Sequence, residues 1–138
     1  MFSYPAQIVP DGKGYLVTFR DIPEAMTGGA TKAEALEMAV DALTTAMDFY
    51  FEDRRTVPDP SRLRKNEVGV ELPVSLAAKV LLLNEMVARK VTPSALARKL
   101  HTSPQVVNRI VNLRHPTKID TISEAISALG KRLVLKVA

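Results

Sequence analysis

Polar side chains of the types that bind nucleic acid follow one another between Thr102 and Lys118. Gln and Asn can make paired hydrogen bonds with an adenine edge in the major groove, and Arg can do so with guanine. Hydroxyl and cationic side chains contact phosphate oxygens, and a helix N-terminus also favours an anion. The residues that we predict to contact DNA are Thr102, Ser103, Gln105, Val106, Asn108, Arg109, Asn112, Arg114 and Lys118.

Two short helices, over residues 93–100 and 104–113, are predicted to position these side chains. Thr92-Pro93 and Ser103-Pro104 each place a capping hydroxyl before a proline at the first helical position, where a missing N–H costs nothing. Ala97 is small enough to lie where the two helices cross. The predicted buried face consists of Leu96, Leu100, Val107 and Ile110. The pattern is that of a helix-turn-helix, although a capped helical hairpin that packs only for stability is the simpler alternative.

The spacing resembles the Cro/phage-repressor-like family of helix-turn-helix domains. His101 occupies the turn position where that family usually has glycine, and histidine tolerates a positive φ at modest cost. Flanking helices are predicted over residues 76–89, capped by Ser75, and over residues 121–129, closed by Gly130. Residues 133–137 are predicted to form a short strand that could pair with a second subunit.

Charge is divided unevenly along the chain. Residues 1–53 hold three bases and nine acids, a net charge of −6, whereas residues 54–66 carry +4 and residues 67–138 carry +6. Residues 89–118 contain seven Lys or Arg and no acid. The basic part has the electrostatic footprint of a nucleic-acid binder, although on charge alone a solvated surface explains it equally well.

Composition narrows the possible classes of protein. The chain has no cysteine, so it can form neither disulfides nor thiolate metal sites, and its two histidines cannot make a closed zinc site. We expect no cofactor and no metal. Its apolar runs are too short for a transmembrane helix, and the first residues lack the features of a signal peptide. The expectation is a cytoplasmic protein that does not contact membranes.

The N-terminal part is predicted to be a small β-β-α unit with a further strand. Residues 4–9 and 14–20 are predicted strands joined at the Asp11-Gly12 turn signal, and Pro23 with Gly28-Gly29 predicts an irregular loop. Thr31 and Glu34 form a capping box that opens a helix to about residue 51. Its apolar stripe is Ala35, Leu36, Ala39, Val40, Leu43, Met47 and Tyr50.

Prolines and bases without apolar periodicity interrupt the chain over residues 54–66. We therefore predict an α+β protein with three parts. Residues 1–56 form the N-terminal α+β core, and residues 57–74 form a linker with a third strand at about 67–72. Residues 75–138 form an all-helical DNA-binding and dimerisation domain with a short C-terminal strand.

Three aspartates of the acidic part, Asp21, Asp41 and Asp48, raise the alternative of a Mg²⁺-dependent nuclease. The spacing argues against it, because Asp41 and Asp48 are two helical turns apart and Asp21 lies in the predicted loop. Solvent-facing acids, or a surface for a basic protein partner, explain them more simply. We therefore expect no catalytic residue and no enzymatic activity.

The N-terminal motifs resemble the HicB antitoxin family. They are Tyr4-Pro5-Ala6, Gly14-Tyr15-Leu16-Val17-Thr18-Phe19, Asp21-Ile22-Pro23-Glu24-Ala25, Thr27-Gly28-Gly29 and Thr31-Lys32-Ala33-Glu34-Ala35. The resemblance implies a partial RNase H-like fold without the RNase H catalytic residues. It also implies a partner, a small basic mRNA interferase of the HicA type, and repression of the protein's own operon by the C-terminal domain.

These expectations define the hypotheses to be tested. The first is an antitoxin that binds its toxin directly and binds operator DNA as a homodimer or higher oligomer. Its toxin-contacting residues are expected to be Asp21, Glu24, Asp48 and Glu52. The alternatives are a stand-alone transcriptional repressor with a ligand- or protein-sensing N-terminal domain, and the nuclease.

Overall fold

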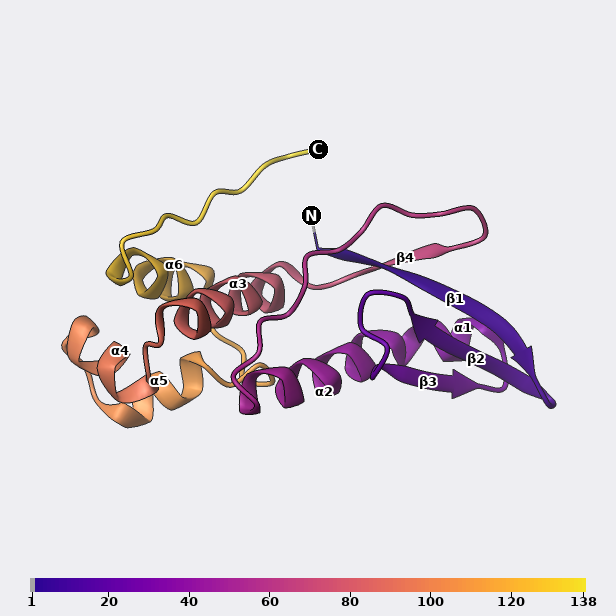
Figure 1. Ribbon diagram of the computed structural model, residues 1–138, viewed down its shortest axis with the longest axis horizontal. Helices are drawn as coiled ribbons and strands as arrows, with labels where there is room; N and C mark the ends of the chain where they lie inside the picture. Colours follow the sequence, from indigo (N-terminus) through magenta and orange to yellow (C-terminus); the bar gives the residue numbers. More distant parts are fainter. Residues whose placement is uncertain (1) are drawn as a thin grey trace. The chain divides into compact units, whose positions relative to one another are not determined.

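The computed structural model describes residues 2–138 and divides into two compact units (Figure 1). Unit 1 contains the chain up to Asp53 together with Val57–Leu72, and unit 2 contains Arg54–Thr56 and Pro73–Ala138. The α+β class is confirmed, since unit 1 holds a four-stranded antiparallel sheet with two helices and unit 2 is helical. Within residues 2–138 no helix is both long and apolar enough to cross a membrane.

The sheet of unit 1 is built on the predicted hairpin. Strands β1 (Ser3–Asp11) and β2 (Gly14–Phe19) pair antiparallel, with Asp11 opposite Gly14. Gly12, at the turn, has a φ of +60°, which glycine adopts without steric cost. Strands β3 (Met26–Gly29) and β4 (Val68–Glu71) flank the hairpin, and the strand order is β3-β2-β1-β4. β4 is the further strand that the sequence predicted.

Strand β3 corrects the prediction of an irregular loop around Gly28-Gly29. A Cβ atom added at Gly28 would lie 2.9 Å from the carbonyl oxygen of Tyr15 in β2. One added at Gly29 would lie 2.6 Å from the backbone nitrogen of Ala35. The glycines therefore allow β3 to approach its neighbours closely, a role that sequence alone does not distinguish from a loop breaker.

The predicted helix of unit 1 is interrupted once. It forms α1 (Lys32–Glu37) and α2 (Ala39–Glu52), because the backbone at Met38 (φ −84°, ψ −8°) departs from regular helix geometry. The capping box is present: Thr31 Oγ1 accepts from the Glu34 N–H, and the Glu34 carboxylate accepts from the Ala30 N–H. Of the predicted stripe, Ala35, Ala39, Leu43, Met47 and Tyr50 are buried, whereas Leu36 is 37% exposed. Burying each large apolar side chain stabilises the unit by roughly 1.5–3 kcal/mol.

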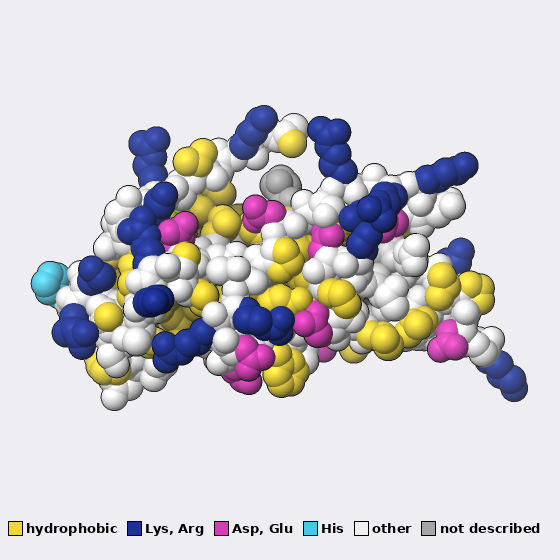
Figure 2. Space-filling model, viewed as in Figure 1, with side chains coloured by type: hydrophobic (Ala, Val, Ile, Leu, Met, Phe, Trp, Pro, Cys, Tyr) yellow, Lys and Arg dark blue, Asp and Glu magenta, His cyan; other side chains and the backbone are white. Residues whose placement is uncertain are grey.

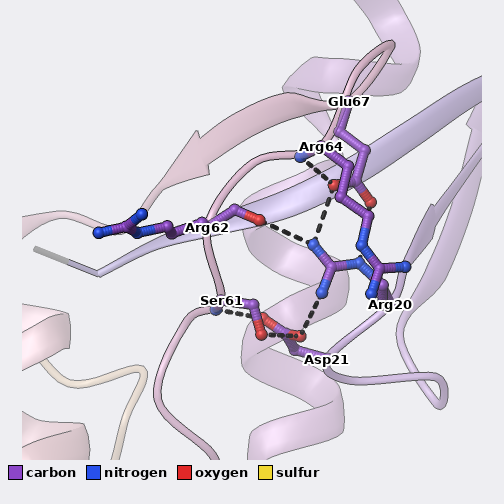
Figure 3. Close-up of polar contacts among 6 residues, drawn as sticks. All are labelled: Arg20, Asp21, Ser61, Arg62, Arg64 and Glu67. Carbon is purple, nitrogen blue, oxygen red and sulfur yellow. Dashed lines mark hydrogen bonds and ion pairs between the residues drawn. The ribbon is translucent and has the colours of Figure 1, made fainter.

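Residues 57–67 form an irregular loop that is bonded to the sheet of unit 1. The Tyr4 hydroxyl donates to the Pro58 carbonyl at 2.7 Å, and burial raises the pKa of this phenol. The Asp21 carboxylate accepts from both the N–H and the hydroxyl of Ser61 at 2.7 Å (Figure 3). Val57 is buried. The segment that we interpreted as a linker is therefore packed into unit 1 as far as Leu72.

Arg20 and Glu67 close this loop with an ion pair. The Arg20 guanidinium donates through Nε and Nη2 to the two carboxylate oxygens of Glu67, at 3.1 and 2.9 Å, and also to the Arg62 carbonyl (Figure 3). The Arg64 N–H donates to Glu67 as well. Hydrogen bonding from Arg20 lowers the pKa of Glu67 below its ordinary value of 4.5.

Unit 2 contains four helices: α3 (Val74–Arg89), α4 (Pro93–Leu100), α5 (Pro104–Ile110) and α6 (Ile119–Ala128). The prediction that Ser75 caps α3 is wrong, because the helix begins at Val74 and the Ala77 N–H donates to the Pro73 carbonyl. Helix α5 ends three residues before the predicted end at Leu113, and α6 begins at Ile119 rather than at 121.

The chain after α6 contains one confirmed feature and one segment whose predicted partner is a second subunit. Gly130 has a φ of +79° and closes α6, with its N–H donating to the Ser127 carbonyl and the Lys131 N–H to Ile126, a Schellman motif. Residues 133–137 form no strand in the single chain, because a strand needs a partner and unit 2 is otherwise helical. Their pairing with a second subunit stays a prediction. Val134, Leu135 and Val137 are exposed.

A buried lysine on α3 fixes the end of α5. The Lys79 side chain is 1% exposed, and its Nζ donates to the backbone carbonyls of Arg109, Asn112 and His115 at 3.1, 2.8 and 2.5 Å. Three ammonium donors thus meet three acceptors, which compensates for removing the charge from water. Burial lowers the pKa of Lys79 to about 8, so the group is still mostly charged at neutral pH.

We predict that Lys79→Met destabilises unit 2 by about 1–3 kcal/mol, because three carbonyl oxygens lose a buried donor. Urea unfolding monitored by circular dichroism measures the change. Lys99→Met, on the exposed surface of α4, is the matched control and should change stability by less than about 0.5 kcal/mol. Equal effects of the two substitutions would contradict the role assigned to Lys79.

We also predict a pH-dependent effect of Glu67→Gln on melting temperature. A carboxylate whose pKa is lowered in the folded state stabilises the fold above its unfolded pKa, and this stabilisation is lost as the pH falls through the lowered value. The variant should therefore melt below the parent protein above pH 4.5 and converge with it in acid. Glu71→Gln, an exposed residue of β4, should show no such convergence.

Candidate nucleic-acid interface

Helices α4 and α5 are joined by a turn of three residues, His101 to Ser103. Both predicted caps form: Thr92 Oγ1 accepts from the Ala95 N–H at 3.1 Å, and Ser103 Oγ accepts from the Val106 N–H at 3.3 Å. His101 adopts the left-handed conformation (φ 52°, ψ 45°), and the Thr102 N–H donates to the Ala97 carbonyl at 3.0 Å. The histidine thus takes the conformation for which glycine is more common.

The buried and exposed faces of α5 match the predicted ones. Val107 and Ile110 are buried at 0% and 3% exposure, and Leu96 and Ala97 of α4 are buried too, whereas Leu100, predicted on the same face, is half-buried. The side chains on the outer face of α5 are Gln105, Val106, Asn108 and Arg109, all exposed. Packing of α5 against α4 therefore leaves two amides and one guanidinium of a single helix facing outward.

The other predicted DNA-contacting residues lie at the two ends of α5. Thr102 is half-buried, and the Ser103 hydroxyl accepts the cap bond but keeps its own proton to donate. Asn112 lies beyond the helix, where its Oδ1 accepts from the Arg114 N–H at 3.0 Å, and this orients the amide within a turn. Arg114 and Lys118 are exposed on the segment before α6.

Lys79 is not among the residues that the sequence predicted to matter for this surface. A signal was present, because Lys79 falls on the apolar stripe of α3 between Leu76 and Leu83, at helical spacing. Its three acceptors come from the last turn of α5 and the residues that follow, so they could not be foreseen from the chain order. Lys79 orients the helix that carries the exposed amides.

The two units differ more strongly in net charge than the segments compared along the sequence. Unit 1 holds six Lys or Arg and twelve Asp or Glu, a net charge of −6. Unit 2 holds thirteen Lys or Arg and three Asp or Glu, a net charge of +10. Lys and Arg side chains gather over α4 and α5 in Figure 2. The surface with the exposed amides is therefore the one that attracts polyanions.

The four acids that were predicted to contact a toxin have different surroundings. Asp21 is held by Ser61 and Arg20, and Glu24 accepts from the Tyr50 hydroxyl at 2.7 Å. Asp48 and Glu52 lie on α2, and Glu52 is exposed. Asp21 thus has a structural role in the loop, which sequence spacing did not reveal.

The described residues give no support to the nuclease alternative. Within residues 2–138 no group of three or more His, Cys, Asp or Glu side chains is arranged to hold a metal ion. Asp21 is bonded to the loop of residues 57–67, whereas Asp41 and Asp48 lie on α2.

Comparisons with known proteins agree with the resemblance seen in the motifs. The family described as "HicB_like antitoxin of bacterial toxin-antitoxin system" matches residues 3–81. The chain is 58% identical over 132 residues to Antitoxin HicB 2 of Photorhabdus laumondii, covering 96% of this chain and 94% of the relative. It is 49% identical to Antitoxin HicB of Escherichia coli K12, covering 96% of both chains, and 33% identical to Antitoxin HicB of Pseudomonas fluorescens, covering 99% of this chain and 94% of the relative. The chain belongs to the HicB-like family of antitoxins of bacterial toxin–antitoxin systems.

Proposed function

We propose that this protein has two activities, one in each unit. Unit 1 binds and neutralises a small basic mRNA interferase of the HicA type. Unit 2 binds promoter DNA as a homodimer and represses the operon that encodes both proteins. The two units have opposite charges, −6 and +10, and this supports the assignment of a basic protein partner to one and DNA to the other.

The outward face of α5 is the observation that carries the DNA-binding proposal. Helices α4 and α5 act as a helix-turn-helix of the Cro/repressor type, with α5 as the recognition helix in the major groove. Gln105 and Asn108 have the amides that pair with adenine, and Arg109 has the guanidinium that pairs with guanine. Thr102, Ser103, Arg114 and Lys118 contact the flanking phosphates. Relatives named Antitoxin HicB align with nearly the whole chain, so the similarity extends through α5.

The toxin-binding proposal depends on family membership and on charge. An enzyme that handles RNA must carry basic side chains, and an acidic antitoxin surface attracts it and can cover its active surface. Unit 1, for which the family resemblance implies a partial RNase H-like fold, acts by binding alone.

The exposed C-terminal segment is the proposed dimer contact. Val134, Leu135 and Val137 are 72%, 64% and 98% exposed in the single chain. An extended apolar segment with unpaired backbone groups is suited to pairing with its copy in a second subunit. Such a dimer presents two α5 helices to two operator half-sites.

We predict that Arg109→Ala weakens binding to the operon's own promoter fragment by roughly 10- to 100-fold, since one bidentate guanine contact contributes about 1–3 kcal/mol. Fluorescence anisotropy at fixed salt measures the affinity. Arg62→Ala, an exposed arginine of unit 1, is the control and should bind DNA normally. Both variants should still protect cells that express the toxin, and loss of protection by Arg109→Ala would contradict the division of labour between the units.

We predict that Leu135→Glu converts the dimer to a monomer and lowers operator affinity by on the order of 100-fold, because the two half-sites are no longer bound together. Light scattering coupled to size-exclusion chromatography gives the mass. Val9→Glu, an exposed apolar position of β1, should remain dimeric. A dimeric Leu135→Glu variant would place the dimer contact elsewhere.

A further inference from the structure

A groove in unit 1 lies between the edge strand β3 and helix α2. It has a volume of about 230 Å³ and is lined by two acids, by Met26 and Thr27 of β3, and by Ala42, Thr45, Ala46 and Phe49 of α2. We call it the α2–β3 groove. All its lining residues belong to unit 1, and β3 is at the end of the strand order, with β2 as its neighbour in the sheet.

Part of the groove's surface is apolar, and the fold of unit 1 leaves that part exposed. Met26 and Phe49 are 58% and 57% exposed, and Met38, directly before α2, is 48% exposed. Residues 38, 42, 45 and 49 recur at helical spacing and form a second stripe beside the buried one at 39, 43, 47 and 50. Large apolar side chains gathered on one face are typical of a protein-binding surface.

Acidic side chains lie beside this second stripe. Glu24 and Asp41 line the groove itself, and Glu52 follows Phe49 by one helical step on α2. Residues 22–53, which include β3, α1 and α2, hold seven acids and a single base, Lys32. On the face drawn in Figure 2, hydrophobic and acidic side chains lie together over α2. An apolar centre with a charged rim is the usual composition of a protein interface.

We infer that the α2–β3 groove is the surface on which the toxin docks, an inference that rests on the proposed antitoxin function. The partner chemistry that fits is a basic protein with an exposed apolar side chain: the side chain fills the space beside Met26 and Phe49, and the bases face the acidic rim. β3 also offers the free edge of the sheet to an extended segment of the toxin. A second copy of this chain fits less well, because its own groove carries the same negative charge.

Substitution of the exposed apolar residues Phe49 and Met26 tests this inference. The probe is the small basic protein encoded by the reading frame next to this gene, and its binding to the full-length chain is measured by isothermal titration calorimetry. Phe49→Ser and Met26→Ser should each weaken binding at least tenfold. Leu63→Ser is the matched control, because Leu63 is 54% exposed in the loop of residues 57–67 and lies outside the groove. It should change the affinity less than threefold.

The possible outcomes distinguish failure of the groove inference from failure of the proposed antitoxin function. Melting temperatures of the three variants should match that of the parent chain, since all three side chains are more than half exposed. If the parent chain binds the probe and Phe49→Ser binds equally well, the groove is not the docking surface, although the antitoxin function stands. If the parent chain does not bind the probe, both proposals fail. A change of oligomeric state in Phe49→Ser would assign the groove to a second copy and overturn the inference.

Discussion

The three hydrogen bonds from Lys79 to the end of α5 are the interaction on which the proposed DNA-binding surface depends. A short helix of seven residues has little stability of its own, and its last carbonyl groups need donors. Lys79 of α3 donates to the Arg109 carbonyl in the last turn of α5 and to the carbonyls of Asn112 and His115 just beyond it. Arg89 of the same helix donates to the Leu129 carbonyl at the end of α6. Helix α3 therefore holds the C-terminal ends of two other helices with one buried and one exposed cation, where the helix dipole favours positive charge.

Unit 1 is organised by a different constraint, the need to hold a long irregular loop against a small sheet. Arg20 and Asp21, which directly follow β2, form hydrogen bonds with residues 61–67. These bonds position the segment that leads into β4. As a result, the side chains of Asp21 and Arg20 are bonded to other residues of unit 1. Other acids of unit 1 lie along α2, beside the apolar side chains that the fold leaves exposed.

Opposite net charges on the two units have a physical consequence for the proposed function. A basic toxin and a polyanionic promoter attract different parts of the same chain, so both can be bound without competing for one surface. Family membership identifies the protein as an antitoxin. The exposed faces of α2 and α5 support the proposal that unit 1 binds the toxin and unit 2 binds DNA.

The sequence by itself determined the elements whose signals are local. The Asp11-Gly12 hairpin, the caps at Thr31, Thr92 and Ser103, and the closure at Gly130 all depend on residues within a few positions of each other. Charge counts and helical spacing likewise predicted the exposed face of α5.

Only the tertiary structure decided what depends on distant segments. Gly28 and Gly29 form an edge strand because β2 and the start of α1 are close enough to require them. Asp21 bonds a loop 40 residues away, and Lys79 reaches acceptors 30 to 36 residues away. The role of each of these residues is ambiguous in the sequence, because the contact that stabilises it is made with a residue that only folding brings close.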